Sequence, residues 1–282
     1  MAQATAPSFS NPRPKLAYSR EGTPLPERVA AYPELRYMGS KQRLLPWIHD
    51  VLAPLQFDSA LDPFSGSGCV AYLLKTMGKR VVATDFLRFS SHLAKAAIEN
   101  NRHHLDGPAI KALLRERRSK AAGFVERTFA GVFYTVEDLR FIDRVSTNIL
   151  RVSNPYQQSL ARSALVRSCL KRQPRGVFTV SGDLSKYDDG RRDLRLSIEE
   201  HFLEQIEVFN GVVFDNGRRN YACQADVFDS RPVKVRSCIS RSAVRTPSRR
   251  QLLHQALPLP RRVVLLLERR RNRLHNENQE DS

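Results

Sequence analysis

A glycine-rich turn that begins with an acid is the first segment of this chain that could do chemistry. The sequence DPFSGSG at residues 62–68 follows a short apolar stretch and precedes a helical pattern. Gly66 and Gly68 can adopt backbone conformations closed to other residues, so they permit a tight turn and let a ligand approach bare backbone. The start of the following helix would face that ligand. The segment is therefore a candidate ligand-binding loop, and the plain alternative is a tight turn that binds nothing.

A second acid lies where the next β-branched stretch ends. Asp85 follows residues 80–84 and is placed to accept hydrogen bonds from the diol of a ribose. A phosphate-binding P-loop is excluded because no Gly-Lys-Ser/Thr sequence follows the glycines. The spacing Gly66-x-Gly68-x-x-Ala71 does satisfy a relaxed dinucleotide fingerprint. A nicotinamide-dependent oxidoreductase that binds NAD is therefore one candidate.

The elements that must position these acids alternate between strand and helix. The apolar and β-branched patterns predict strands at 59–62 and 80–84 and helices at about 70–77 and 91–103. This order is the opening of a doubly wound parallel sheet, so the fold class is α/β. Residues 208–214 are predicted to form a hairpin or strand. The stretch 221–228 is predicted to be a strand, an acid and a helix start that return the chain to the sheet.

Between about 105 and 208 the chain is mainly helical in pattern and strongly basic. The stretch 161–175 contains no acid and includes four cations that could face a polyanion: Arg162, Arg167, Lys171 and Arg172. The formal net charge of the whole chain is +17, which also favours a polyanionic partner. A solvated helix face is the alternative interpretation.

Composition excludes several classes of protein. A hydrophobic share of 41% and a charged share of 27% are typical of a globular chain and not of a wholly disordered one. No apolar run reaches the roughly 20 residues that a membrane span needs, so no membrane partner is expected. The four cysteines are scattered without metal-site spacing, so neither a metal nor a disulfide framework is expected.

Two further features change the balance between these candidates. The sequence YMGSK at residues 37–41 precedes the glycine turn, and Asp226 follows the predicted returning strand. The order Tyr-x-Gly-x-Lys, Asp-Pro-Phe-x-Gly-x-Gly and a later strand-end acid resembles the Dam-like, D12 class adenine-specific DNA methyltransferases. The resemblance covers about residues 35–230. It departs from the dehydrogenases at Asp62 and at the Lys41 motif.

The resemblance implies S-adenosylmethionine as the cofactor and gives eight residues a place around it. They are Tyr37 and Lys41 at its methionine end, Asp62, Phe64, Gly66 and Gly68 in the turn, Asp85 at the ribose and Asp226 at the adenine. It also implies that the basic insertion recognises double-stranded DNA, with Arg162, Arg167, Lys171 and Arg172 as phosphate contacts. A cytoplasmic, nucleoid-associated location and a cognate restriction enzyme are further expectations.

The catalytic motif of that family is missing from this chain. The family places Asp-Pro-Pro-Tyr shortly after the position of Asp226, where it contacts the exocyclic amine of a flipped adenine. Residues 241–245, RSAVR, can be encoded CGA TCC GCC GTA CGT, and one base later the same letters spell Asp-Pro-Pro-Tyr-Val. Possible codons for residues 251–262, read one base later, likewise spell Asn-Cys-Tyr-Ile-Lys-Arg-Tyr-His-Phe-Leu-Asp. The sequence therefore predicts a change of reading frame soon after Ser230, and no catalytic residue is assigned.

The composition of the last 52 residues supports the frame change. Residues 231–282 carry 13 Lys and Arg against four acids and contain no Phe, Tyr, Trp or Gly. The chain is predicted to begin with a flexible arm at residues 1–30. A core at 31–105 and 216–230 is interrupted by a target-recognition insertion at 106–215. An irregular out-of-frame tail follows at 231–282. The chain as written is expected to be inactive. A non-catalytic DNA-binding protein with a methyltransferase fold stays open as an alternative.

Overall fold

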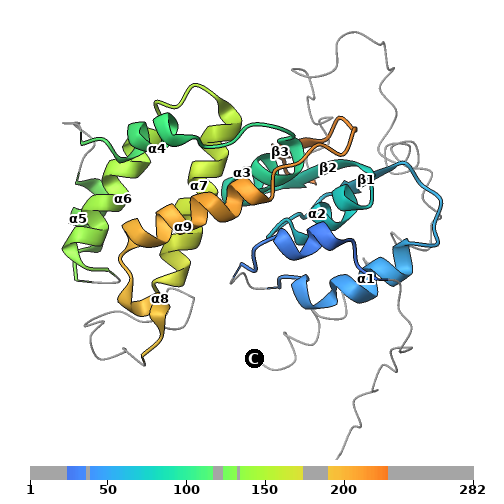
Figure 1. Cartoon of the computed structure of the whole chain (residues 1–282), viewed down its shortest axis with the longest axis horizontal. Helices are drawn as coiled ribbons and strands as arrows, with labels where there is room; N and C mark the ends of the chain where they lie inside the picture. Colours follow the sequence, from blue (N-terminus) through green and yellow to red (C-terminus); the bar gives the residue numbers. More distant parts are fainter. Residues whose placement is uncertain (1–23, 36–38, 117–122, 132–133, 174–189, 228–282) are drawn as a thin grey trace, which may run out of the picture.

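The computed structural model describes residues 24–35, 39–116, 123–131, 134–173 and 190–227 (Figure 1). The core contains strands β1, β2 and β3 at Ser59–Asp62, Arg80–Asp85 and Tyr221–Gln224. Its helices are η1 at Glu27–Ala31, η2 at Gln42–Leu44, α1 at Leu45–Leu52, α2 at Cys69–Thr76, α3 at Arg88–Ala94 and the π-helical turn η3 at Lys95–Glu99. Tyr37, the tail after Ser230 and most of the predicted arm lie outside the described residues.

The three strands form a parallel sheet in the order β1-β2-β3. Ala60 pairs with Val81, and Ala83 pairs with Ala222, so strands separated by about 140 residues lie in register. A parallel pair needs a crossover connection, which α2 supplies between β1 and β2. The α/β, Rossmann-like fold class is therefore confirmed.

One face of the sheet is packed beneath helices. Ala60, Val81, Ala83 and Ala222 alternate onto this face and are almost fully buried. The helices that pack closely on the described strands are α2, α3 and η3. Their side chains and the small strand residues form the core of this part of the molecule.

A buried lysine joins the two crossover helices. The Nζ atom of Lys75 on α2 donates to the carbonyl oxygens of Ala97 and Asn100, at 3.0 and 2.9 Å, where η3 ends. It also lies 4.6 Å from the centroid of the Phe214 ring. Burial lowers the pKa of Lys75 to about 7. Lys75 therefore satisfies carbonyl groups that the end of a helix leaves without partners.

The segment between η3 and β3 is helical, as the sequence predicts. It contains α4 at Gly107–Leu114, α5 at Phe124–Phe129, α6 at Val136–Ile149, α7 at Pro155–Lys171, α8 at Arg192–Arg195 and α9 at Ile198–Gly211. Figure 1 shows these helices on one side of the molecule and the strands with α1 and α2 on the other. The contact between α3 and α7 links the two parts.

One element prediction is wrong, and one predicted helix forms with different bounds. Residues 208–211 are not a strand, because α9 runs to Gly211: Ser197 and Glu200 form a capping box at its start, and Phe202 and Phe209 are buried at helical spacing. The helix predicted at 91–103 begins at Arg88 and ends with η3. Asn100 stops it, since the Asn100 Oδ1 atom accepts from the backbone N–H of His103 at 2.9 Å.

The end of the predicted arm belongs to the core. Val29 and Tyr32, in and after η1, are buried against the rest of the protein. The Tyr32 ring lies 4.6 Å from that of Tyr72 on α2, measured between ring centroids. This packing places η1 beside the helix that follows the glycine turn.

Candidate functional site

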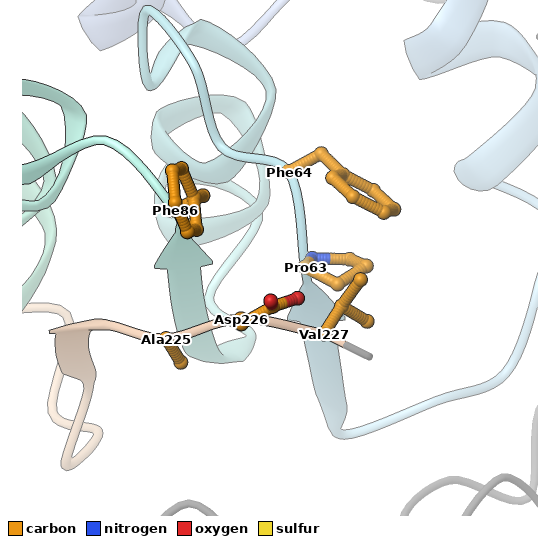
Figure 2. Close-up of a pocket in the computed structure, with 6 residues that line it drawn as sticks. All are labelled: Pro63, Phe64, Phe86, Ala225, Asp226 and Val227. Carbon is orange, nitrogen blue, oxygen red and sulfur yellow. The ribbon is translucent and has the colours of Figure 1, made fainter. Parts of the chain in front are cut away.

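The site lies where the parallel strands end. Pro63 and Phe64 follow β1, Phe86 follows β2, and residues 225–227 follow β3. Together they line an open pocket of about 240 Å³. Figure 2 shows the Phe64 and Phe86 rings around the pocket and the Asp226 carboxylate directed toward Pro63. Ligands of open α/β sheets bind at this edge, beyond the carboxyl ends of the strands.

Asp85 holds the glycine turn against the sheet. Its Oδ2 atom accepts from the backbone N–H of Gly66, and its Oδ1 atom accepts from that of Leu87, both at 2.8 Å. Its own carbonyl oxygen accepts from the backbone N–H of Ala225 at 2.9 Å. One buried residue therefore ties together the segments that follow all three strands. Each carboxylate oxygen has lone pairs left for a further donor.

The two glycines occupy conformations that other residues rarely adopt. Gly66 has φ of +49° and Gly68 has φ of +80°, in the left-handed region. A Cβ atom on Gly68 would lie 2.5 Å from the hydroxyl oxygen of Tyr32. That hydroxyl donates to the carbonyl oxygen of Ser67 at 2.5 Å. Tyr32 therefore packs against the turn and fixes the carbonyl oxygen of Ser67. No feature of the sequence near the turn indicated this role.

The surroundings of Asp62 raise the pKa of its carboxyl group. Burial, together with the charge of Asp85, raises its pKa to about 6. The backbone N–H groups of Phe64 and Ala71 act in the opposite direction. A carboxyl that is costly to ionise is typical of a position where a cation or a hydrogen-bond donor binds.

The segment before the turn reaches the site as the sequence predicts. The Oγ atoms of Ser40 and Ser67 lie 3.3 Å apart, so residues 39–41 lie against the glycine turn. The exposed Lys41 side chain donates to the carbonyl oxygen of Gly39 at 2.9 Å. The structure thus brings together Lys41, the glycine turn, Asp85 and Asp226. The roles predicted for them stay predictions.

The four cations predicted to contact DNA differ in their surroundings. Lys171 forms an ion pair with Asp193 at 2.8 Å, and Arg172 forms one with buried Asp138 at 3.2 Å. Arg167 donates to the side-chain oxygen of Gln205. These three side chains stabilise contacts between helices of the insertion. Arg162 is different, because its buried Nε atom has no hydrogen-bond partner in the described part of the chain.

Two negative findings apply to the described residues alone. They contain no group of three or more His, Cys, Asp or Glu side chains that could hold a metal ion. Among the same residues no helix has the length and apolar character that crossing a membrane requires.

Comparison with known proteins agrees with this geometry. Over 209 residues the chain is 31% identical to a protein of Haemophilus parahaemolyticus described as Type II methyltransferase M2.HphI. The match covers 70% of this chain and 61% of that relative, so the chain spans about three fifths of the relative's length. No solved structure matches the chain. Residues 37–215, which include the glycine turn, Asp85 and helices α4 to α9, match a sequence family, and the chain therefore belongs to the D12 class N6 adenine-specific DNA methyltransferases.

Proposed function

We propose that this chain belongs to an S-adenosylmethionine-dependent enzyme that methylates the exocyclic amine of adenine in DNA. The observation that carries the proposal is the glycine turn, which Asp85 holds by a hydrogen bond beside an apolar pocket that Asp226 also lines. Family membership supplies the reaction class. The DNA substrate also supports a cytoplasmic location at the nucleoid.

The residues present fit the cofactor. The rings of Phe64 and Phe86 offer flat apolar surface to an adenine, and both are exposed, at 50% and 67%. Asp85 and Asp226 offer carboxylate oxygens to hydroxyl and amine donors. Gly66 and Gly68 leave backbone open to close approach. When bound, S-adenosylmethionine would supply a methyl group on a positively charged sulfur. Asp62, in the glycine turn, would help to hold it.

The chain as written does not carry Asp-Pro-Pro-Tyr, so we propose that it binds the cofactor without transferring the methyl group. The family match ends at residue 215, before the tail whose composition predicts a changed frame. A frame-restored chain would supply the acid and the aromatic ring that hold the flipped adenine.

Calorimetry with S-adenosylmethionine and with NAD tests the cofactor assignment. We expect S-adenosylmethionine to bind and NAD not to bind. Phe86→Ala should weaken the binding, whereas Phe124→Ala should leave it unchanged, because Phe124 is similarly exposed, at 62%, but lies on the insertion. Binding of NAD in place of S-adenosylmethionine would favour the oxidoreductase alternative.

The missing motif favours one second candidate, a DNA-binding protein without catalysis. A methyl-transfer assay on duplex DNA, with an adenine-free duplex as control, separates the two. The frame-restored chain should transfer methyl groups and the chain as written should not. If neither transfers while both bind duplex, the non-catalytic function is favoured.

The name of the relative suggests a wider context. M2.HphI is described as a Type II methyltransferase. We propose that this chain comes from a restriction-modification system, with double-stranded DNA as substrate and a cognate restriction enzyme as its counterpart.

A further inference from the structure

Three basic side chains converge where the core meets the insertion. His92 on α3 contacts Ser159 on α7, with 3.1 Å between the His92 Nδ1 and Ser159 Oγ atoms. Arg88 precedes His92 by four residues, and Arg162 follows Ser159 by three. Residues at these spacings share one face of a helix. The His92–Ser159 contact therefore brings Arg88, His92 and Arg162 to the same side of the α3–α7 interface.

Among the described residues, the two arginines lack the ion pairs that the other cations of the region have. In the described ranges of the chain, neither Arg88 nor Arg162 forms an ion pair, and the buried Arg162 Nε and His92 Nε2 atoms accept or donate no hydrogen bond. The neighbouring Lys95, in contrast, pairs with Glu99 at 2.9 Å. Buried polar atoms are normally satisfied, so both nitrogens indicate an absent hydrogen-bond partner. The Arg162 Nε–H group can only donate, so its missing partner is an acceptor.

The positive charges of the cluster also favour a bound anion. Burial and the charges of Arg162, Arg88 and Lys95 together lower the pKa of His92 to about 4. Burial and the charge of Arg88 also lower the pKa of Arg162. The charges that lower the pKa of His92 are thus those of three cations. An anion placed among the three side chains would relieve this repulsion.

The position of the cluster suggests which anion it binds. Arg88 is two residues from Phe86, which lines the pocket beyond β2. A guanidinium matches the oxygens of a phosphate in geometry as well as charge. We propose that Arg88, His92 and Arg162 bind one backbone phosphate of the DNA next to the cofactor pocket, an inference that rests on the proposed function.

Binding to a duplex oligonucleotide across a range of salt concentrations tests the site. The variant Arg88→Gln/Arg162→Gln should bind more weakly, and its slope of log affinity against log salt should flatten by about 0.9 for one lost phosphate contact. Arg140→Gln/Arg218→Gln is the matched control, since it removes the same charge from two exposed arginines of other regions. A slope equal to that of the control would overturn the proposal.

A titration of His92 by NMR tests the site without DNA. Sulfate keeps its charge across the titration, and bound in the cluster it should raise the pKa of His92 in the wild type but not in Arg88→Gln/Arg162→Gln. No shift in the wild type would overturn the anion site. The His92→Gln variant identifies the resonance.

The two measurements also separate this inference from the proposed function. If sulfate shifts His92 but the wild type binds no duplex, the proposed function fails and the DNA assignment falls with it. If the double variant loses affinity for S-adenosylmethionine while its salt slope is unchanged, the anion is the carboxylate of the cofactor, and the DNA phosphate is again excluded.

Discussion

Asp85 illustrates how one side chain can serve both the fold and a ligand. Its two oxygens accept from Gly66 and Leu87, so removing the carboxylate leaves two backbone N–H groups without acceptors. An unsatisfied buried group costs about 1–3 kcal/mol. We therefore expect Asp85→Ala to lower the free energy of unfolding by about that amount and to weaken S-adenosylmethionine binding, as denaturant unfolding and calorimetry would measure.

Asp85→Asn separates the two roles, because it keeps one acceptor oxygen for the turn. It should unfold closer to the wild type and still bind the cofactor weakly. The control Asp58→Ala, at an exposed position, should change neither quantity. Full cofactor affinity in Asp85→Asn would make Asp85 a structural residue only.

The close approach at Gly68 gives a prediction with an internal control. Alanine in the left-handed region costs about 1–2 kcal/mol, and at Gly68 it would also collide with the Tyr32 hydroxyl. Gly78 has φ of +74° and open space around it. Gly68→Ala should therefore destabilise the protein more than Gly78→Ala does, as thermal or denaturant unfolding would show.

The collision itself can be tested with a second substitution. Tyr32→Phe removes the oxygen in question, so it should cost less in the Gly68→Ala background than in the wild type. Additive losses in this double-mutant cycle would show that the strained backbone, and not the contact with Tyr32, explains the glycine.

Asp62 makes the stability depend on pH. Its pKa is raised from 3.8 to about 6, so the folded protein binds a proton more tightly than the unfolded chain does. The stabilising contribution is complete below the unfolded pKa and is lost as the pH rises through about 6. Asp62→Asn should remove this part of the pH profile of the unfolding free energy. A profile unchanged from the wild type would contradict the shift.

At the scale of elements, α9 shows where sequence patterns mislead. The stretch 208–214 is rich in β-branched and aromatic residues, which indicate a strand. The capping box eleven residues upstream and the buried face of Ile198, Phe202, Ile206 and Phe209 favour a helix through Gly211 instead. Tertiary burial overrides local propensity here, and a window longer than seven residues was needed to see it.

The capping box itself can be tested. Ser197 accepts from the backbone N–H of Glu200, and the Glu200 carboxylate accepts from that of Ser197 at 2.8 Å. Loss of such a cap costs about 1 kcal/mol. Ser197→Ala should lower the free energy of unfolding by that amount, and Ser197→Asp, which keeps an acceptor, should restore most of it. Equal stability of all three proteins would show that tertiary contacts alone fix the start of α9.

Much of the core was predictable because each strand there ends on a residue with a chemical signature. The glycine turn, Asp85 and Asp226 mark the ends of three strands, and parallel strands place such ends together. The internal pairing of Lys171 and Arg172 was not predictable, because their partners Asp193 and Asp138 lie 22 and 34 residues away in the sequence. A run without acids does not show which cations the fold has already neutralised.

At the scale of the whole molecule, the sheet has two unlike faces. Ala60, Val81 and Ala222 are covered by helices, whereas Leu61 on the opposite face is 41% exposed and its neighbours Val82 and Tyr221 are only partly buried. Parallel sheets occur almost only with both faces covered. The described part of the chain therefore covers one face of its sheet with helices and leaves the other partly exposed. A change of frame before the remaining elements stays a prediction.

Restoring the reading frame upstream of codon 241 tests this interpretation directly. The restored chain should regain aromatic and apolar residues able to cover Leu61 and its neighbours, so its free energy of unfolding and the denaturant dependence of that energy should both rise. A chain that stops after Ser230 is the control, and it should be as stable as the chain as written, because residues 231–282 supply no aromatic side chain to a core. If the coding nucleotides do not spell Asp-Pro-Pro-Tyr in the shifted frame, the interpretation fails, and so it does if the truncated chain is markedly less stable. In either case the basic tail would require an explanation as part of the native protein.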